Sequence, residues 1–311
     1  MSIALLFPGQ GAQSPGFLQH LPEHAVVRAT LDQASEILEE DVAALDSPQA
    51  LSSTVAVQLT TLVAGVAAWR VLGEEGVTAD AVAGLSVGAF AAAVACGTLA
   101  FADALPLVKL RAEGMERAYP QGYGMAAIIG LDQRRVMELI ERVGGAGAQL
   151  YLANVNAPLQ MVLSGPDAVL DAVIESARQA GARKAKRLAV SVPSHCPLLD
   201  GVSRQLAQAM TGIELRAPRI PYVGNCRARV AHDAAAVAED LVNNVANTVR
   251  WHDAATVLYE LGVRLFIEPP PGQVLSRLAR DAFDDARSVA MEEVQLDSVV
   301  LLARREQVQA G

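Results

Sequence analysis

The five residues from Gly84 to Gly88 read Gly-Leu-Ser-Val-Gly and constrain the fold more than any other part of the chain. This pattern is typical of a nucleophile elbow, in which a strand turns sharply into a helix and exposes a serine at the turn. Residues 81–83 are apolar and predict a buried strand, whereas the Ala-rich residues 89–96 predict a helix. We therefore expect a strand, a turn and a helix, with Ser86 either a nucleophile or part of a purely structural turn.

Composition limits the classes of protein that can contain this elbow. The chain has 311 residues, of which 52% are hydrophobic, enough for one large α/β domain or for a core with an inserted subdomain. Its net charge of −9 argues against a nucleic-acid binder and fits an enzyme of small molecules. The three cysteines, Cys96, Cys196 and Cys226, include no Cys-x-x-Cys pair, so neither a disulfide framework nor a metal site is expected.

No segment predicts an address outside the cytoplasm. Residues 1–8 lack the basic region and the long apolar stretch of a signal peptide. The apolar run 55–71 is interrupted by polar residues, which favours a buried core helix over a membrane span. We expect a cytoplasmic protein without a membrane partner.

The order of predicted elements indicates two structural units. Strands alternating with helices in residues 1–120 and 195–311 predict a mostly parallel sheet covered on both faces, similar to an α/β hydrolase core. Residues 121–194 show the strand–helix–strand–strand–helix–strand order of a ferredoxin-like subdomain. The predicted strands of this insertion are 125–131, 149–155, 160–164 and 185–192, and its helices are 133–143 and 166–180.

A serine nucleophile needs a base, and His195 is the best placed of the five histidines. It follows the predicted strand that ends at Val192, and strand ends are where α/β sites assemble. A buried structural histidine is the alternative. Three acidic residues between Ser86 and His195 lie on the subdomain helix, and none is a convincing triad acid, so a main-chain carbonyl is an alternative partner for the imidazole. Those acidic residues are Asp167, Asp171 and Glu175.

Other residues predict an oxyanion hole and an anion clamp. The amide of Val87 follows the serine, and the Gly-rich loop 7–13 can bring the amide of Gln10 near the elbow. Arg111 lies within the predicted helix 101–118. It is either a bidentate clamp for a substrate carboxylate or a charge on a solvated helix face.

With these residues in place, the chain resembles the malonyl-CoA:acyl-carrier-protein transacylase family over nearly its full length. Several short motifs in the right order carry the resemblance. They are Phe7 to Gln13, Gln58, the Ser86 elbow, Arg111 with Met115, residues 124–131, residues 154–156 with Gln160, Ser164-Gly165, residues 192–195, residues 249–251, and Glu268-Pro269 running into residues 271–275.

The resemblance implies a role for each matching residue. Ser86 would carry the acyl group, His195 would be the base, and the carbonyl of Arg250 would orient His195. Gln10 and Val87 would donate the oxyanion hydrogen bonds. The remaining substrate-binding positions are Arg111 for the malonyl carboxylate, Asn156, Gln58 and Ser194. No cofactor would be permanently bound, because malonyl-CoA is the substrate and the partner carries the prosthetic group.

Three positions depart from the usual family pattern. Leu85 replaces a histidine before the serine, Ala89 replaces a glutamate after the elbow, and Ser194 replaces a phenylalanine before the base. The smaller Ser194 leaves more room beside the acyl group. Together the departures resemble the epsilon subunit of malonate decarboxylase, which moves malonyl to a small carrier subunit. We therefore expect that carrier as the acceptor.

Three other functions are weighed against this one. The first is the transacylase of fatty-acid or polyketide synthesis, which shares the chemistry but uses an acyl carrier protein. The second is an esterase or thioesterase, and the third a non-catalytic assembly subunit. A basic cluster, defined as Arg183, Lys184, Lys186 and Arg187, is either a solvated charge run or a docking site for the carrier or the CoA phosphates.

Overall fold

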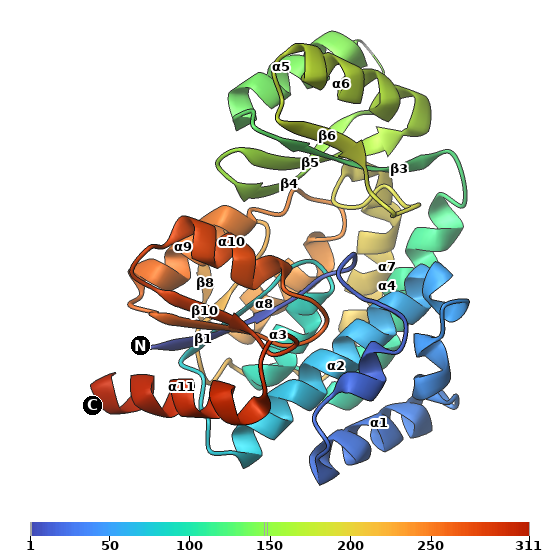
Figure 1. The fold of residues 1–311 in the computed structure, drawn as a ribbon. Coiled ribbons are helices and arrows are strands. Elements are labelled where there is room, and N and C mark those ends of the chain that lie inside the picture. The colour runs from blue at the N-terminus through green and yellow to red at the C-terminus, as the bar shows by residue number, and fades with distance from the viewer. Residues whose placement is uncertain (1, 146, 148, 311) are drawn as a thin grey trace.

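The computed structural model describes residues 2–145, 147 and 149–310, and its larger sheet has six strands in the order β10-β9-β1-β2-β7-β8 (Figure 1). Neighbouring strands run parallel, except that β8 pairs antiparallel with β7 at the edge. The strands are β1 (Ile3–Phe7), β2 (Ala81–Gly84), β7 (Tyr222–Val223), β8 (Val230–Ala231), β9 (Leu265–Glu268) and β10 (Arg287–Ala290). This parallel core confirms the predicted fold class.

Helices cover both faces of the larger sheet. Alternate side chains of β1 point to opposite faces: Ile3, Leu5 and Phe7 join one apolar cluster, whereas Ala4 and Leu6 join the other. The first cluster includes α1 (Ala25–Leu38), α2 (Thr54–Glu74), α3 (Gly88–Ala95), α4 (Phe101–Ala118), α7 (Asp200–Met210), α8 (Ala234–Asn243) and α11 (Leu296–Ala310). The second includes α9 (Trp251–Glu260) and α10 (Val274–Ala282). Short 3₁₀ helices span Phe17–His20, Val42–Asp46, Ala50–Ser52 and Pro197–Leu199.

A second, antiparallel sheet of four strands lies in the order β4-β5-β3-β6. With two helices on its outer face it has the strand order of a ferredoxin-like unit, as predicted (Figure 1). Its elements are β3 (Tyr123–Ile129), α5 (Gln133–Gly144), β4 (Tyr151–Ala157), β5 (Gln160–Pro166), α6 (Asp167–Gln179) and β6 (Lys184–Arg187). The domain division at residues 120/121 and 194/195 stays a prediction, and its outermost residues, 1 and 311, lie outside the described residues.

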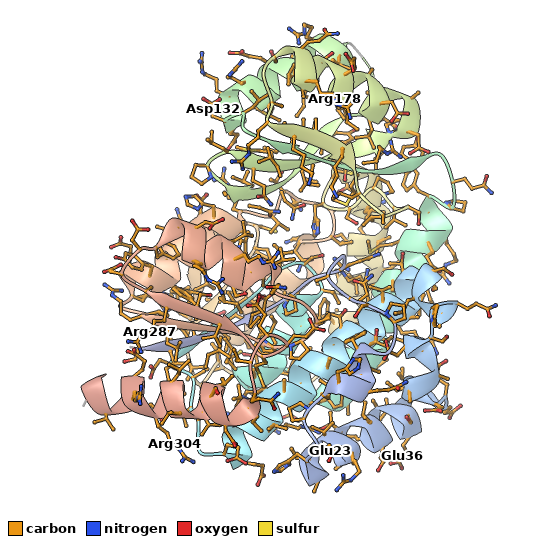
Figure 2. The ribbon with its side chains drawn as sticks, viewed as in Figure 1. Glu23, Glu36, Asp132, Arg178, Arg287 and Arg304 are labelled. Carbon is orange, nitrogen blue, oxygen red and sulfur yellow. The ribbon has the colours of Figure 1, made fainter. Side chains whose placement is uncertain are left out.

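Most charged side chains lie at the outside of both units, and the interior is mainly apolar. Figure 2 labels six of them around the periphery, namely Glu23, Glu36, Asp132, Arg178, Arg287 and Arg304.

The long helix α2 is apolar enough to span a membrane, but 83% of its most apolar stretch is buried within the protein. The hydroxyl of Ser53 caps this helix by accepting a hydrogen bond from Val55 N at 3.1 Å. We therefore assign α2 as the core helix that the sequence predicts.

Two parts of the sequence prediction need correction. The last strand of the small sheet was predicted to reach Val192, but β6 ends at Arg187. Leu188 N still donates to Met125 O at 2.9 Å, and the chain then leaves the sheet edge, so His195 follows an irregular segment. Four elements were not predicted: α1, β8, β10 and α11. β8 has only two residues, and β10 begins at an exposed arginine, so neither gives a clear apolar run.

Two glycines allow the elbow to pack against β1. A Cβ atom on Gly88 would lie 2.2 Å from the carbonyl oxygen of Phe7, and one on Gly84 would lie 2.1 Å from that of Gly88. Both distances are far inside van der Waals contact with backbone atoms that cannot move aside. The first turn of α3 can therefore approach β1 this closely only because these positions have no side chain.

We predict that Gly88→Ala destabilises the protein by about 3 kcal/mol, since the new methyl group forces α3 away from β1. The free energy of unfolding, measured by urea titration, checks this value. The matched control is Gly73→Ala, where the added Cβ meets nothing within 4 Å in helix α2. That variant should be stabilised by up to about 1 kcal/mol. Equal stability of the two variants would contradict the packing argument.

Candidate active site

Ser86 stands at the carboxyl edge of the parallel sheet, directly after β2 and before α3. Its φ of 56° is left-handed, a conformation that costs a non-glycine residue about 1–3 kcal/mol. Hydrogen bonds hold it there: Leu85 N donates to Phe7 O at 2.9 Å, and Ser86 N donates to Asn225 Oδ1 at 2.9 Å. The predicted strand–turn–helix elbow is thus present, with the serine in the strained position.

A cavity of about 350 Å³ opens beside Ser86, between the two sheets. One wall comes from the loop after β1 and from the elbow, and another from the inner face of the small sheet. The segment that follows β6 and the start of α10 complete the lining. Its residues include Gln10, Gln58, Ser86, Met115, Met125, Asn156, Val162, Lys186, Leu188, Ser194, His195 and Leu275. The irregular segment after β6 therefore brings His195 to the same cavity as Ser86.

His195 is 3% exposed and is held through its ring nitrogen Nδ1, which lies 2.5 Å from the carbonyl oxygen of Asn244. Because a carbonyl only accepts, Nδ1 carries the proton and Nε2 keeps a free lone pair. Burial, reinforced by the positive charge of Arg111, lowers the pKa of His195 to about 3, although the Asn244 hydrogen bond opposes the shift. His195 is therefore a neutral imidazole at pH 7, as a general base must be.

The predicted partner of His195, the carbonyl of Arg250, was wrong. Arg250 is the N-cap residue of helix α9, and its carbonyl oxygen accepts the first helical hydrogen bond, from Ala254 N at 3.0 Å. Asn244 instead follows the last residue of α8, where helix carbonyls have no intrahelical partner. The Asn244 carbonyl is therefore free to accept from the imidazole.

Arg111 is fully buried beside Ser86 and bonds only to neutral groups in the described chain. Its Nη1 donates to Gln58 Oε1 at 2.6 Å, and its Nη2 donates to Ser86 Oγ at 3.1 Å and to Asn244 Oδ1 at 3.3 Å. Its Nε has no partner among the described residues. Burial lowers the pKa of Arg111 to about 9, which leaves the guanidinium charged at pH 7. The alternative of a solvated helix face is excluded, because Arg111 is 0% exposed.

Three other predicted substrate-binding residues lie in or beside the cavity. Gln58 holds Arg111 and donates from its Nε2 to the sulfur of Met115 at 3.4 Å. Asn156 lines the cavity, and its buried Oδ1 has no partner in the described chain. The carbonyl of Ser194 accepts from Ser164 Oγ at 2.6 Å, which fixes the backbone just before His195. Several neutral polar groups thus line the cavity, and the buried cation Arg111 lies beside it, bonded to Gln58 and Ser86.

The two predicted oxyanion donors flank Ser86. The loop containing Gln10 lies against the elbow, because a Cβ on Gly9 would be only 2.8 Å from the carbonyl oxygen of Leu85. Val87 is the cap residue of α3. Within the described chain neither the Gln10 nor the Val87 amide N–H pairs with an acceptor. Both amides are available to a negatively charged oxygen.

Ser86 and His195 line the same cavity, but no hydrogen bond joins them in the part of the chain that the structure describes. The serine oxygen accepts from Arg111 instead. Nucleophile–base contacts are often long without substrate and shorten in the complex.

Among the described residues no group of three His, Cys, Asp or Glu side chains could hold a metal ion.

The acidic residues of the subdomain helix do not reach His195. Arg187 of the basic cluster forms ion pairs with Asp167 and, at 3.9 Å, with Asp171. In the described chain these carboxylates pair with Arg187, and the imidazole bonds to a carbonyl instead. They also occupy one member of the basic cluster, whereas Lys186 lines the cavity.

Asn225, whose side-chain oxygen accepts from the amide of Ser86, was not predicted from the sequence. A signal was available, because Asn225 lies two residues after β7 and Ser86 two residues after β2. β7 and β2 are parallel neighbours, so polar residues after both must meet at one edge. Asn244 gave no such signal, because its contact with His195 uses a backbone carbonyl.

Comparison with known proteins places this site in a family. The family described as acyl transferase domain matches residues 4–308. The chain is 36% identical over 296 residues to the malonyl CoA-acyl carrier protein transacylase of Salmonella typhimurium, covering 93% of this chain and 96% of that protein. It is 32% identical over 310 residues to the protein of that name from Bacillus subtilis, with 98% of each chain covered.

Solved structures give the same picture. An acyl-carrier-protein S-malonyltransferase from Burkholderia pseudomallei superposes with a TM-score of 0.91 and 37% identity, covering 97% of this chain and 100% of that one. A malonyl-transacylase in complex with a type II PKS acyl-carrier protein gives a TM-score of 0.91 and 33% identity, covering 97% and 99%. The elbow, the buried histidine and the nearly complete match together show that this chain belongs to the acyl transferase domain family and is an acyltransferase.

Proposed function

We propose that the protein moves malonyl from malonyl-CoA to the thiol of an acyl carrier protein, through an acyl-enzyme on Ser86. The observation that carries this proposal is Arg111, a fully buried guanidinium 3.1 Å from the serine oxygen without a carboxylate partner in the described chain. A buried cation of this kind favours an anionic ligand. Malonyl supplies a carboxylate at one end and a thioester at the other, which suits a cation beside a nucleophile.

The proposed reaction has two half-reactions of the same kind. Nε2 of His195 takes the proton of Ser86 Oγ as the oxygen attacks the thioester carbon, and the amides of Gln10 and Val87 stabilise the oxyanion. The carbon–sulfur bond then breaks, and CoA leaves as a thiol with the proton from His195. The carrier thiol next gives its proton to His195 and attacks the acyl-serine. The ester bond breaks, and the proton returns to Ser86.

Arg111 would act by position as well as by charge. Its planar guanidinium can hold a carboxylate through two parallel hydrogen bonds. Gln58 and Asn244 already bind it from two other sides and fix its plane. A carboxylate held there fixes one end of the three-carbon acyl group, so that the thioester carbon lies within attack distance of Ser86.

The acceptor is the point at which the comparisons change the expectation. Sequence analysis favoured the carrier subunit of malonate decarboxylase, but the relatives named above are transacylases of acyl carrier protein. We therefore propose acyl carrier protein as the acceptor. Leu85, Ala89 and Ser194 support the decarboxylase carrier as a second candidate, because they depart from the usual family pattern. The esterase alternative is disfavoured by Arg111, and the assembly-subunit alternative by the retained Ser86 and His195.

Intact-mass measurement after brief mixing with malonyl-CoA tests the proposal. We expect a malonyl adduct on the wild type and none on Ser86→Ala. Discharge is then followed after adding either holo acyl carrier protein or the decarboxylase carrier subunit, and the acyl carrier protein should accept malonyl faster. No adduct and no free CoA would refute the transferase function. Rapid loss of the adduct in buffer alone would favour the thioesterase.

Replacing Arg111 should change the choice of acyl group. In Arg111→Met the side chain keeps a similar length but loses the charge. The variant therefore loses a charge-assisted hydrogen bond to the substrate that contributes about 2–3 kcal/mol. We expect kcat/KM for malonyl-CoA to fall roughly 30- to 150-fold, whereas kcat/KM for acetyl-CoA falls far less. Arg111→Lys is the control that keeps the charge without the fork. An equal loss for both acyl groups would contradict the clamp.

The low pKa of His195 predicts the pH dependence of acylation. A depressed pKa means that the base form persists on acidification and is lost only near pH 3. The single-turnover acylation rate should therefore stay nearly constant from pH 8 to pH 5. An ordinary histidine, with a pKa of about 6.5, would retain only about 3% of its base form at pH 5. A fall in rate centred near pH 6.5 would show that His195 is not shielded as the structure indicates.

A further inference from the structure

A buried carboxylate outside the predicted site is linked to the nucleophile. Asp240 lies on α8, is 9% exposed, and forms no ion pair with a cation of the described chain. Neutral donors surround both of its oxygens. They are Asn225 N at 2.7 Å and Cys226 N at 3.0 Å on Oδ1, and Tyr222 OH at 2.8 Å and Asn225 Nδ2 at 3.2 Å on Oδ2.

Asn225 connects this carboxylate to the elbow. Its side-chain nitrogen, Nδ2, donates to Asp240. The oxygen of the same side-chain amide, Oδ1, must therefore face the opposite side. That oxygen accepts from the backbone N–H of Ser86 at 2.9 Å. Asp240 therefore determines which end of the Asn225 amide points at the nucleophile, because a flipped amide would place two N–H groups against the Ser86 amide.

The link acts on a strained residue of the site. Ser86 is left-handed, and the peptide before it is fixed on both sides, by Ser86 N on Asn225 and by Gly88 N on Leu85 O at 2.9 Å. The orientation of this peptide sets the direction of the Ser86 side chain and of the next amide, that of Val87. Both are groups that the proposed acylation uses.

The same helix also holds the base. Asn244 N donates to Asp240 O at 2.9 Å, one helical turn along, and the Asn244 carbonyl accepts from His195. The end of α8 thus contacts the nucleophile through the side chain of Asp240 and the base through the backbone of Asn244. A displacement of Asp240 would change the distance between Ser86 and His195.

We propose that Asn225 and Asp240 are positioning residues, which hold the elbow so that Ser86 Oγ and the Val87 amide point at the thioester carbon. This inference rests on the proposed function, because the rate it concerns is the acylation of Ser86. Neither residue contacts the substrate in this scheme, so the expected defect is in the rate of acylation and not in the affinity for malonyl-CoA.

Three variants separate positioning from simple stability. Asn225→Leu removes the acceptor for the Ser86 amide and keeps the branching pattern of the side chain. Asn225→Asp keeps an acceptor but places a second carboxylate against Asp240. In the exchanged pair, Asn225→Asp with Asp240→Asn, the carboxylate accepts from the Ser86 amide and from the new amide at position 240, so the link is rebuilt with reversed polarity.

Tyr222→Phe is the matched control. It removes one hydrogen bond from the same carboxylate oxygen of Asp240 that Asn225 Nδ2 contacts, but it leaves the link to Ser86 in place. Urea unfolding of each variant gives its stability. The single-turnover rate of acylation by malonyl-CoA and the dependence of that rate on malonyl-CoA concentration are then measured on the folded protein.

We expect Asn225→Leu to lower the maximal acylation rate on the order of 100-fold, with little change in the half-saturating concentration of malonyl-CoA. The exchanged pair should recover to within roughly 5-fold of the wild type, whereas Asn225→Asp alone should not. Tyr222→Phe should lose stability without losing rate. If Asn225→Leu does not fold, the acylation rates of Asn225→Asp and of the exchanged pair decide whether the two residues position Ser86.

The proposal is overturned if Tyr222→Phe loses as much rate as Asn225→Leu, or if the exchanged pair is no faster than Asn225→Asp. A wild-type protein that malonyl-CoA does not acylate would refute the proposed function instead. In that case a fluorophosphonate still tests the positioning of Ser86. The serine oxygen attacks phosphorus, fluoride leaves, and His195 takes the serine proton. Equal labelling rates for the wild type and Asn225→Leu would overturn the proposal on that readout as well.

Discussion

The buried guanidinium of Arg111 is the interaction on which the rest of the site depends. Removing an ion from water costs several kcal/mol, and the neutral oxygens around Arg111 offset only part of that cost. Those oxygens come from α2, the elbow and the residue after α8, so one side chain of α4 connects three other segments. A carboxylate bound there would supply the missing negative charge. The burial of this cation, which costs stability in the free protein, is therefore also the basis of the proposed choice of substrate.

The topology explains why these groups meet at one place. Parallel strands end at a common edge, and the residues after β1, β2 and β7 supply Gln10, Ser86 and Asn225. The small sheet adds the opposite wall of the cavity. A parallel bridge joins the two units near that wall, where Val155 N donates to Val249 O and Val249 N donates to Ala153 O, both at 2.9 Å. The cavity therefore has one wall that carries the proposed nucleophile and another that can shape the acyl pocket.

The sequence predicted those parts of the molecule that depend on side-chain patterns. The apolar run 55–71 and the predicted helix 101–118 located α2 and α4 to within a few residues, and the glycines of the elbow identified Ser86 because only glycine permits so close an approach. The prediction failed where backbone groups or irregular segments decide. The residues after Arg187 are apolar enough for a strand, but β6 has only one partner strand and the chain leaves it. The elements β8 and β10 were missed because pairing with existing strands, not their own composition, makes them strands.

The partner of His195 shows the same limit at the level of one hydrogen bond, because the carbonyl of Asn244 binds the imidazole and not the predicted carbonyl of Arg250. Every residue has a carbonyl, so residue type does not reveal which carbonyl will be free; that depends on where a helix ends. Arg250 is the N-cap of a helix and its carbonyl accepts the first helical hydrogen bond, whereas Asn244 follows the last turn of α8. The carbonyl carries no net charge, so it fixes the tautomer of His195 and raises the pKa less than a carboxylate would. A base of low pKa stays neutral beside Arg111, so that no repulsion arises between two cations next to Ser86.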